Sequence, residues 1–282
     1  MSKNKKKLID LHVHTIYSDG IFGPEQVVQK ALDMGLTALA ITDHDCIDGV
    51  VPCEKAAKGR GIEIISGVEI SAVIEETEIH ILGYYIDVKN KALVNALCEL
   101  RKNRVLRFKK MVSLLNDHGI TISEDKVLGV NPGGVVGRLN LARAIIEKNK
   151  QLDIKTVFDK YIGDGKPCYV KHKKLDYRTA IKLIRDSGGV AVLAHPGTMG
   201  NDKYIEDYVK AGLRGIEALH IKHRAGISAK YSDIAKKYNL IVTGGSDCHG
   251  GNEDKALIGK IKLDYEIAEK LQEETKKHDS KL

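Results

Sequence analysis

Short apolar runs that alternate with helical patterns most constrain how this chain of 282 residues folds. Seven such runs have the length and composition of strands, and helical segments lie between most of them. Strands that alternate with helices of this length are typical of βαβ units and of a parallel sheet, which we expect to close into a barrel. The predicted strands are 8–13, 37–41, 62–68, 78–84, 189–194, 214–219 and 240–244, and the predicted helices are 24–34, 49–59, 177–187, 202–211 and 228–238.

One interval, from about residue 90 to residue 174, breaks this alternation. It begins with a long helical pattern over residues 91–118, followed by the glycine-rich stretch LGVNPGGVVG and by helical patterns near 138–149 and 153–161. We therefore expect a small helical insertion that leaves the barrel after its fourth strand. The predicted division is 1–89 for the first part of the barrel, 90–174 for the insertion and 175–282 for the second part of the barrel.

The net charge of +7 is concentrated in this interval. Residues 90–174 hold 18 Lys and Arg against 8 Asp and Glu, whereas the remainder holds 27 against 30, so the two balances are +10 and −3. A basic segment beside an active site would attract phosphate-rich ligands. A solvated helical face is the other interpretation of such a run.

Composition excludes several classes of protein. No apolar run approaches the ~18 residues of a membrane span, and the basic leader MSKNKKK lacks the apolar core of a secretory signal. The five cysteines are odd in number and never spaced as C-x-x-C. This pattern favours free thiols in a reducing cytoplasm over a disulfide framework or a cysteine-zinc site. No protein partner is evident from the sequence.

The stretch IDLHVHTIYSDG, residues 9–20, places two histidines where the first predicted strand ends. Residues two apart in a strand point to the same side, so His12 and His14 share a face, and Asp19 follows in a turn. This geometry suits a metal ion at a strand end. Taken alone, the stretch is equally compatible with a buried core histidine and a turn aspartate.

Other histidines and acids also lie at or beside predicted strand ends, mostly carboxyl ends. In parallel barrels the loops at the carboxyl ends of the strands carry the active site. Imidazole and carboxylate without thiolate suit Zn, Mn or Fe, and nine candidate ligands imply two or three ions. The nine are His12, His14, Asp19, His44, Glu69, His80, His195, Asp247 and His249.

Five motifs in this order resemble the PHP (polymerase and histidinol phosphatase) family of metal-dependent phosphoesterases. They are DLHVHTIYSDG, AITDHD, GVEIS, LAHPG and GGSDCHG. The similarity runs along nearly the whole chain and is greatest to the bacterial subgroup with a helical insertion, which includes 3′,5′-nucleotide bisphosphate phosphatases and a 5′-to-3′ exoribonuclease. It implies an α/β fold, a distorted (β/α)7 barrel with a small helical insertion domain.

The resemblance also implies a trinuclear metal site and a function. One ion would be held by His12, His14, Glu69 and Asp247, a second by Glu69, His80 and His195, and a third by Asp19, His44 and His249. Among these ligands, Glu69, Asp247 and His195 would be the catalytic residues. The expected activity is hydrolysis, by metal-activated water, of a nucleotide phosphate ester such as that of adenosine 3′,5′-bisphosphate (pAp), or of short 5′-phosphorylated RNA.

Two residues outside the metal site are predicted to bind substrate. Arg138 opens a helical run after Gly137, where its guanidinium and the helix N-terminus could face a phosphate. His223 follows the sixth strand, and its position favours substrate contact or proton donation. Arg143 is predicted to be structural, and Cys248 to pack in a loop. Three other histidines, His118, His172 and His278, are expected at the surface.

Two departures from the family pattern bear on the substrate. The subgroup commonly has Arg-Pro-His where this chain has Arg138-Leu139-Asn140, so a histidine contact is missing. Histidinol phosphatases tend to have His-Gly where this chain has Asp19-Gly20, which disfavours histidinol phosphate. That activity and a noncatalytic, metal-stabilised binding module are the alternative functions.

Overall fold

The computed structural model describes residues 6–124, 137–171, 174–200, 202–250 and 258–279. Within these residues nine strands form one sheet, in the order β8-β7-β6-β4-β3-β2-β1-β9, with β5 beside β3. The strands are β1 (Leu8–Val13), β2 (Ala38–Ile41), β3 (Glu63–Ile74), β4 (Thr77–Tyr84), β5 (Leu175–Asp176), β6 (Val190–Leu193), β7 (Gly215–His220), β8 (Ile241–Gly245) and β9 (Leu263–Asp264). All seven predicted strands are present, and the two-residue strands β5 and β9 were not predicted.

The sheet curves until its two ends nearly meet. After β8 the chain returns to β1, where the His14 N–H donates to the Cys248 carbonyl at 3.0 Å. The buried Asp10 carboxylate on β1 accepts hydrogen bonds from the Ser246 N–H at 3.0 Å and from the Gly259 N–H at 2.8 Å. These contacts close the sheet into the predicted distorted α/β barrel.

The predicted parallel sheet is interrupted at β4. This strand follows β3 through a tight turn and runs antiparallel to β3 and to β6, whereas β1, β2 and β3 are parallel, as are β6, β7 and β8. The hairpin leaves no room for a crossover helix between β3 and β4. Consequently the amino-terminal half of β4, where His80 lies, reaches the same edge of the barrel as the carboxyl ends of its neighbours.

The helices begin where local sequence favours a helix start. Pro24 occupies the first turn of α1, and the side chains of Asn90 and Asp176 cap α3 and α7 by accepting the Leu93 and Arg178 N–H groups. The helices are α1 (Pro24–Asp33), α2 (Val50–Ala57), α3 (Lys91–Asp117), α5 (Arg138–Lys148), α6 (Ile154–Val157), α7 (Tyr177–Asp186), α8 (Ile205–Ala211), α9 (Ala225–Tyr238) and the unpredicted α10 (Glu266–Asp279).

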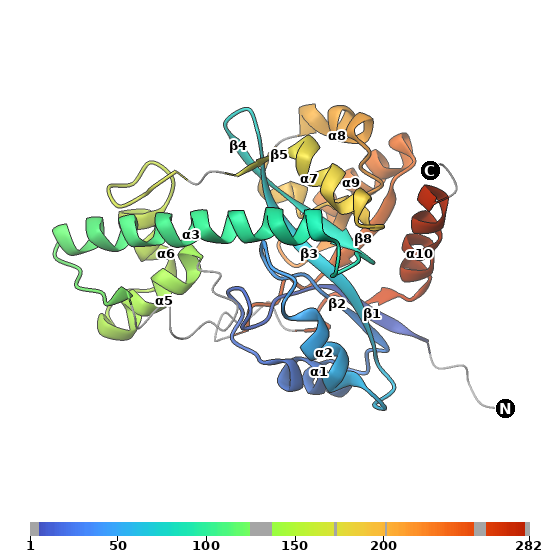
Figure 1. The fold of residues 1–282 in the computed structure, drawn as a ribbon, viewed down its shortest axis with the longest axis horizontal. Helices are drawn as coiled ribbons and strands as arrows, with labels where there is room; N and C mark the ends of the chain where they lie inside the picture. Colours follow the sequence, from blue (N-terminus) through green and yellow to red (C-terminus); the bar gives the residue numbers. More distant parts are fainter. Residues whose placement is uncertain (1–5, 125–136, 172–173, 201, 251–257, 280–282) are drawn as a thin grey trace.

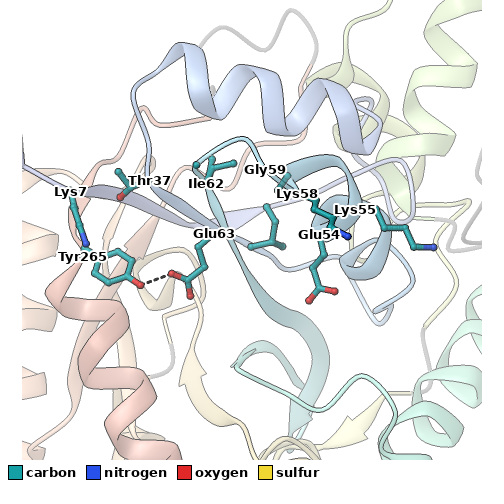
Figure 2. Close-up of a pocket in the computed structure, with 12 residues that line it drawn as sticks. Lys7, Thr37, Glu54, Lys55, Lys58, Gly59, Ile62, Glu63 and Tyr265 are labelled. Carbon is teal, nitrogen blue, oxygen red and sulfur yellow. Dashed lines mark hydrogen bonds between the residues drawn. The ribbon is translucent and has the colours of Figure 1, made fainter.

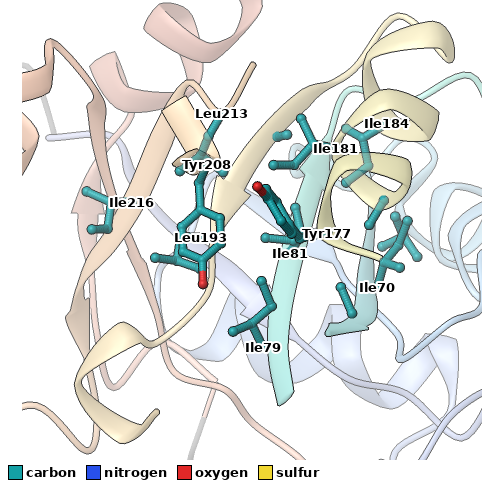
Figure 3. Packing of buried hydrophobic residues seen from close by; sticks show 14 of the residues in the cluster. Ile70, Ile79, Ile81, Tyr177, Ile181, Ile184, Leu193, Tyr208, Leu213 and Ile216 are labelled. Carbon is teal, nitrogen blue, oxygen red and sulfur yellow. The ribbon is translucent and has the colours of Figure 1, made fainter. Parts of the chain in front are cut away.

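Side chains alternate across the strands and fill hydrophobic clusters on both faces of the sheet. On β1, Ile9 and Leu11 join a cluster that α10 covers with Ala268 and Leu271, whereas Leu8 packs on the other side with α1 and α2. Val13 also lies on that other side, beyond the shift in strand register between Asp10 and Val13. The largest cluster lies between β3, β4, β6 and β7 and the helices α7, α8 and α9. Figure 3 shows Ile79 and Ile81 of β4 in this cluster, beside Tyr177 and Tyr208.

A separate hydrophobic cluster lies within the segment predicted to be an insertion. It joins the carboxyl-terminal half of α3 to α5, α6 and the π-helical turn Phe158–Ile162, through Phe108, Leu115, Leu141 and Ile145 among others. Figure 1 shows α3 running from the barrel toward α5 and α6, which lie to one side of the sheet. The boundaries 90–174 stay a prediction, and most of the glycine-rich stretch 128–137 falls outside the described residues.

No helix in the described part of the chain combines the length and the apolar character that a membrane crossing requires.

Candidate metal centre

The nine predicted ligands come together at one edge of the barrel. They lie on β1, β2, β3, β4, β6 and β8 or in the loops that follow these strands, and all of them are buried or partly buried. Because β4 is antiparallel, its His80 joins residues that follow the carboxyl ends of parallel strands. The members are His12, His14, Asp19, His44, Glu69, His80, His195, Asp247 and His249.

Two glycines allow the backbones to approach closely enough for this convergence. A Cβ at Gly20 would lie 2.7 Å from the His14 carbonyl oxygen, so the turn that carries Asp19 back toward β1 requires glycine. A Cβ at Gly245 would lie 2.3 Å from the Cβ of His12, so glycine also permits the contact of β8 with β1. Both glycines therefore serve the barrel closure that forms the site.

The Glu69 carboxylate lies at the centre of the site and is completely buried. Its Oε1 is 2.7 Å from His80 Nδ1 and 2.9 Å from His195 Nε2. Its Oε2 is 3.1 Å from His44 Nδ1 and 3.3 Å from His12 Nε2 and His14 Nε2. One carboxylate thus faces five imidazoles, with its two oxygens directed to different groups of histidines.

Two aspartates complete the cluster on either side of Glu69. Asp247 Oδ1 lies 3.3 Å from His14 Nε2 and 3.5 Å from His12 Nε2. Asp19 lies 3.3 Å from His249 Nε2 through Oδ1 and 4.0 Å from His44 Nε2 through Oδ2. Groups of donor atoms within 4.8 Å of one another include His12, His14, Glu69 and Asp247, then His14, Asp19, His44 and His249, and finally His44, Glu69 and His80.

The unpaired polar atoms of the site fit metal coordination. His14 Nε2, Asp19 Oδ1 and His44 Nδ1 are buried and lack a hydrogen-bond partner, although each lies close to other donor atoms. Buried polar atoms without a partner are costly in a folded protein. Imidazole nitrogens and carboxylate oxygens are the ligands that Zn, Mn and Fe accept, so this set of residues suits a multinuclear metal centre.

The mutual field of these groups alters their pKa values. Burial opposes charging of the His14 ring, but the carboxylates of Asp247 and Glu69 prevail and raise its pKa to about 10. In the same way, burial opposes charging of His80, and Glu69 raises the pKa of His80 to about 9. Burial alone would raise the pKa of Glu69, yet His44, His80 and His12 hold it well below its usual range. The acids are therefore ready to bind cations at neutral pH.

A cavity of about 390 Å³ opens onto this cluster. Its barrel side includes His44, His80 and Asp247, and its other side comes from the segment 90–174 through Arg104, Arg107, Arg138, Leu139 and Phe158. The Arg104 guanidinium donates to Asp45 Oδ2 at 2.7 Å and to Ser71 Oγ at 2.7 Å, which fixes α3 beside the loop that carries His44. The basic segment therefore faces the candidate metal centre.

A larger cavity, of about 710 Å³, lies at the opposite edge of the barrel (Figure 2). Lys7, Thr37 and Glu63 line it, and each lies immediately before or at the start of a parallel strand. None of the histidines whose side chains the structure describes lines this cavity, and its Glu63 carboxylate is hydrogen-bonded to Tyr265. Its position and its residues do not match the chemistry of the histidine cluster.

The two residues predicted to bind substrate, Arg138 and His223, lie in different positions relative to the site cavity. Arg138 lines the site cavity, where its Nη1 is 2.5 Å from Asp164 Oδ1 and its guanidinium lies 5.7 Å from the centre of the Phe158 ring. His223 does not line this cavity. Its two ring nitrogens make backbone hydrogen bonds, accepting from Gly197 N–H at 3.1 Å and donating to the Ala218 carbonyl at 3.0 Å.

The structure also places the residues that were predicted to be structural or to lie at the surface. Arg143 donates to the Asp19 carbonyl at 2.6 Å and so holds α5 against the loop after β1. Cys248 is buried in the cluster with Val13 and Val27. His118 is exposed, as expected. His172 and the side chain of His278 lie outside the described part of the structure.

Sequence reasoning assigned no role to several polar residues around the site. Glu217 and His220 are buried on β7, Glu78 hydrogen-bonds His80 Nε2 at 3.3 Å, and the Lys222 Nζ lies 3.2 Å from Asp247 Oδ2. The signal for Glu217 was available, because an acid in the apolar run GIEALH occupies a buried strand position. The partners of these side chains could not be read from the sequence.

A nearly closed α/β barrel with histidines and carboxylates gathered at the loop edge is typical of metal-dependent hydrolases. The chain belongs to the PHP domain family, which matches residues 10–165. A solved structure from Bifidobacterium adolescentis, classed as a metal-dependent phosphoesterase, superimposes with a TM-score of 0.87 at 27% identity, covering 93% of this chain and 94% of the other.

Two curated relatives cover most of the chain. A 3′,5′-nucleoside bisphosphate phosphatase from Chromobacterium violaceum is 35% identical over 258 residues, which are 89% of this chain and 90% of the relative. A 5′-3′ exoribonuclease, Rnm, from Salmonella typhimurium is 34% identical over 253 residues, 87% of this chain and 86% of the relative. The chain is thus similarly identical to two relatives whose names give different activities.

Proposed function

We propose that this enzyme hydrolyses a phosphate ester of a nucleotide, either a 3′,5′-bisphosphate such as pAp, which gives AMP and phosphate, or short 5′-phosphorylated RNA, which gives mononucleotides. The observation that carries the proposal is the shared cavity, in which the histidine and carboxylate cluster faces Arg138 from the basic segment. A substrate with two phosphates could place one at each of these two positions. The names of the two curated relatives support the same pair of substrates.

We propose two to three divalent ions of Mn, Fe or Zn as the cofactors. His12, His14, Glu69 and Asp247 would hold one ion, Glu69, His80 and His195 a second, and Asp19, His44 and His249 a third; the distances between these side chains support this grouping. Bound divalent ions lower the pKa of water and neutralise phosphoryl oxygens. Glu69, Asp247 and His195 keep the catalytic roles predicted for them.

The residues of the chain itself orient the substrate and balance its charge. Arg138 presents a planar guanidinium, which matches phosphate oxygens in a bidentate manner. Arg104 and Arg107 line the same cavity, so further guanidinium groups lie near the position proposed for the phosphate that stays on the nucleotide. His223, by contrast, would have to give up a backbone hydrogen bond before it could contact substrate or donate a proton.

Product release from a substrate panel tests the proposal, with inorganic phosphate measured for the monoesters and mononucleotides measured for RNA. The panel consists of pAp, short 5′-phosphorylated RNA and histidinol phosphate, each with Mn²⁺ and each repeated with a chelator. We expect metal-dependent release of phosphate from pAp, of mononucleotides from RNA, or of both, with little phosphate released from histidinol phosphate. Preference for histidinol phosphate would establish the alternative phosphatase activity, and no release from any of the three would contradict the proposal.

Replacement of Arg138 by alanine should separate substrate binding from chemistry. A hydrogen bond to a charged group contributes ~1.5–3 kcal/mol, so kcat/KM for pAp should fall by roughly 10- to 150-fold. Hydrolysis of p-nitrophenyl phosphate, which has no second phosphate, and the metal content should stay unchanged. Arg178→Ala, an exposed arginine on α7, is the matched control. Equal losses on both substrates would show that Arg138 serves the fold or the chemistry instead.

We also infer that the protein works in the cytoplasm. Its five cysteines are all free, and four of them are buried. Unpaired thiols are typical of proteins kept in a reducing compartment.

A further inference from the structure

One barrel strand at the site, β7, supplies none of the nine predicted ligands. It nevertheless places two buried polar side chains behind them, Glu217 with 0% and His220 with 2% of the residue exposed. Isolated charges and imidazoles are rarely buried to this extent unless they have partners. Their partners include predicted metal ligands and the backbone of one, and His220 also accepts the Lys222 N–H.

Glu217 contacts two ligands that belong to different proposed ions. Its Oε1 lies 3.0 Å from His12 Nδ1, and its Oε2 accepts the backbone N–H of His195 at 2.8 Å. With the proton held on Nδ1 toward a carboxylate, the His12 ring turns the lone pair of Nε2 toward Glu69 and Asp247. Glu217 therefore sets both the tautomer and the orientation of His12.

The contact with His195 acts on the backbone. His195 has a φ of +25°, a conformation that residues other than glycine adopt only when their surroundings hold them there. The hydrogen bond from its N–H to Glu217 is one such restraint, and it directs the ring toward Glu69, 2.9 Å away. One carboxylate on β7 thus aligns ligands that follow β6 and lie on β1.

His220 supports Asp247 in a parallel way. The Lys222 N–H donates to His220 Nδ1 at 3.3 Å, so the proton of the neutral ring resides on Nε2. His220 Nε2 lies 3.3 Å from Asp247 Oδ2, to which it can donate. The other oxygen, Oδ1, remains directed toward His12 and His14. Asp247 also has a positive φ, +51°, and therefore depends on such restraints.

We propose that β7 is a positioning strand for the metal centre, on which Glu217 and His220 orient His12, His195 and Asp247 and thereby set metal affinity. The inference rests on the ligand assignment of the proposed function. The donor atoms of His12, Glu217 and His220 also lie within 4.8 Å of one another. We favour positioning over an additional ion there, because both Glu217 oxygens and both His220 ring nitrogens already have partners.

The test compares four variants with the wild-type enzyme. Glu217→Gln keeps an acceptor for the His195 N–H but places an amide N–H₂ opposite the His12 Nδ1–H. His220→Leu removes the donor to Asp247, whereas His220→Gln can restore a donor close to the position of Nε2. Glu63→Gln is the matched control, because this acid lies on β3 at the opposite edge of the barrel and pairs with Tyr265. Mn²⁺ affinity is measured by chelator competition, and kcat is measured at limiting and saturating Mn²⁺.

We expect Glu217→Gln and His220→Leu to lower Mn²⁺ affinity by about 10- to 100-fold, the usual cost of removing a partner of a metal ligand. Excess Mn²⁺ should restore much of kcat, and His220→Gln and Glu63→Gln should stay within about threefold of the wild-type affinity. The melting temperature of the metal-free protein separates this role from a purely structural one. If Glu217 and His220 only stabilised the fold, their replacement would lower that temperature, and added Mn²⁺ would not restore kcat.

Three outcomes would overturn the inference. One is unchanged Mn²⁺ affinity in Glu217→Gln and His220→Leu, in an enzyme that still hydrolyses its substrate. This result would contradict the positioning role of β7 but not the proposed function. Loss of one whole equivalent of metal that excess Mn²⁺ does not restore would make β7 a ligand strand. Wild-type protein that binds no Mn²⁺ would contradict both this inference and the proposed function.

Discussion

Replacing Glu69 by glutamine is expected to remove bound metal and activity together. Its two carboxylate oxygens face five imidazoles at 2.7 to 3.3 Å, so the amide would neutralise the charge at the centre of two proposed ion sites. Loss of a partner of a metal ligand costs 10- to 100-fold, and loss of a shared ligand should therefore lower kcat by more than about 100-fold.

Elemental analysis provides the second measurement for this variant. Unchelated wild-type protein should contain two to three equivalents of Mn, Fe or Zn, and Glu69→Gln should contain at least one fewer. Glu63→Gln, on the same strand but at the other edge of the barrel, controls for loss of a β3 carboxylate. Full metal content with a near-native rate in Glu69→Gln would show that this residue does not bridge, and a wild-type value at or below one would refute the trinuclear arrangement.

The second large effect is the pH dependence of metal binding. In the metal-free protein the pKa of His14 is raised to about 10 and that of His80 to about 9, so both rings carry a proton at neutral pH. A metal ion has to displace that proton. We expect the affinity of each of the two ions concerned to rise by about tenfold per pH unit from pH 6.5 to 8.5, with release of protons on binding.

The stability of the metal-free protein should fall as the pH rises, whereas its affinity for metal should increase. Both histidines have folded-state pKa values above the unfolded value of 6.5, so their contribution to the free energy of unfolding is complete below pH 6.5. It is lost as the pH rises toward about 9 and 10. Melting temperatures of chelated protein should therefore decline across this range while Mn²⁺ affinity increases. An affinity that is independent of pH would show that these rings are neutral before the metal binds.

The elements of the barrel and most of its site were predictable from local sequence. Hydrophobic alternation and helical periodicity act over a few residues, which is why β1 has the predicted bounds and why α3 and α7 begin at predicted positions. The His12–His14 spacing places both rings on one face whatever the remainder of the fold does. Because acids and histidines follow several strands, the convergence of nine side chains could also be predicted.

Strand direction and the short elements were decided by tertiary structure. A hydropathy pattern is the same in either direction along a strand, so only pairing shows that β4 runs antiparallel and brings His80 to the site from its amino-terminal half. The two-residue strands β5 and β9 exist only through pairing with β3 and β1. Patterns this short carry no periodicity that sequence reasoning can detect.

Some roles of individual polar residues follow from the sequence, and others depend on the tertiary structure. The class of chemistry follows from the sequence alone, because histidines and acids stand at the predicted strand ends and these residue types are metal ligands. Only the fold decided that Glu217 supports His12 across the barrel, that Arg143 holds the Asp19 loop, and that backbone groups occupy both nitrogens of His223. A hydrogen bond depends on the position of its partner, and these partners lie between 5 and 205 residues away along the chain.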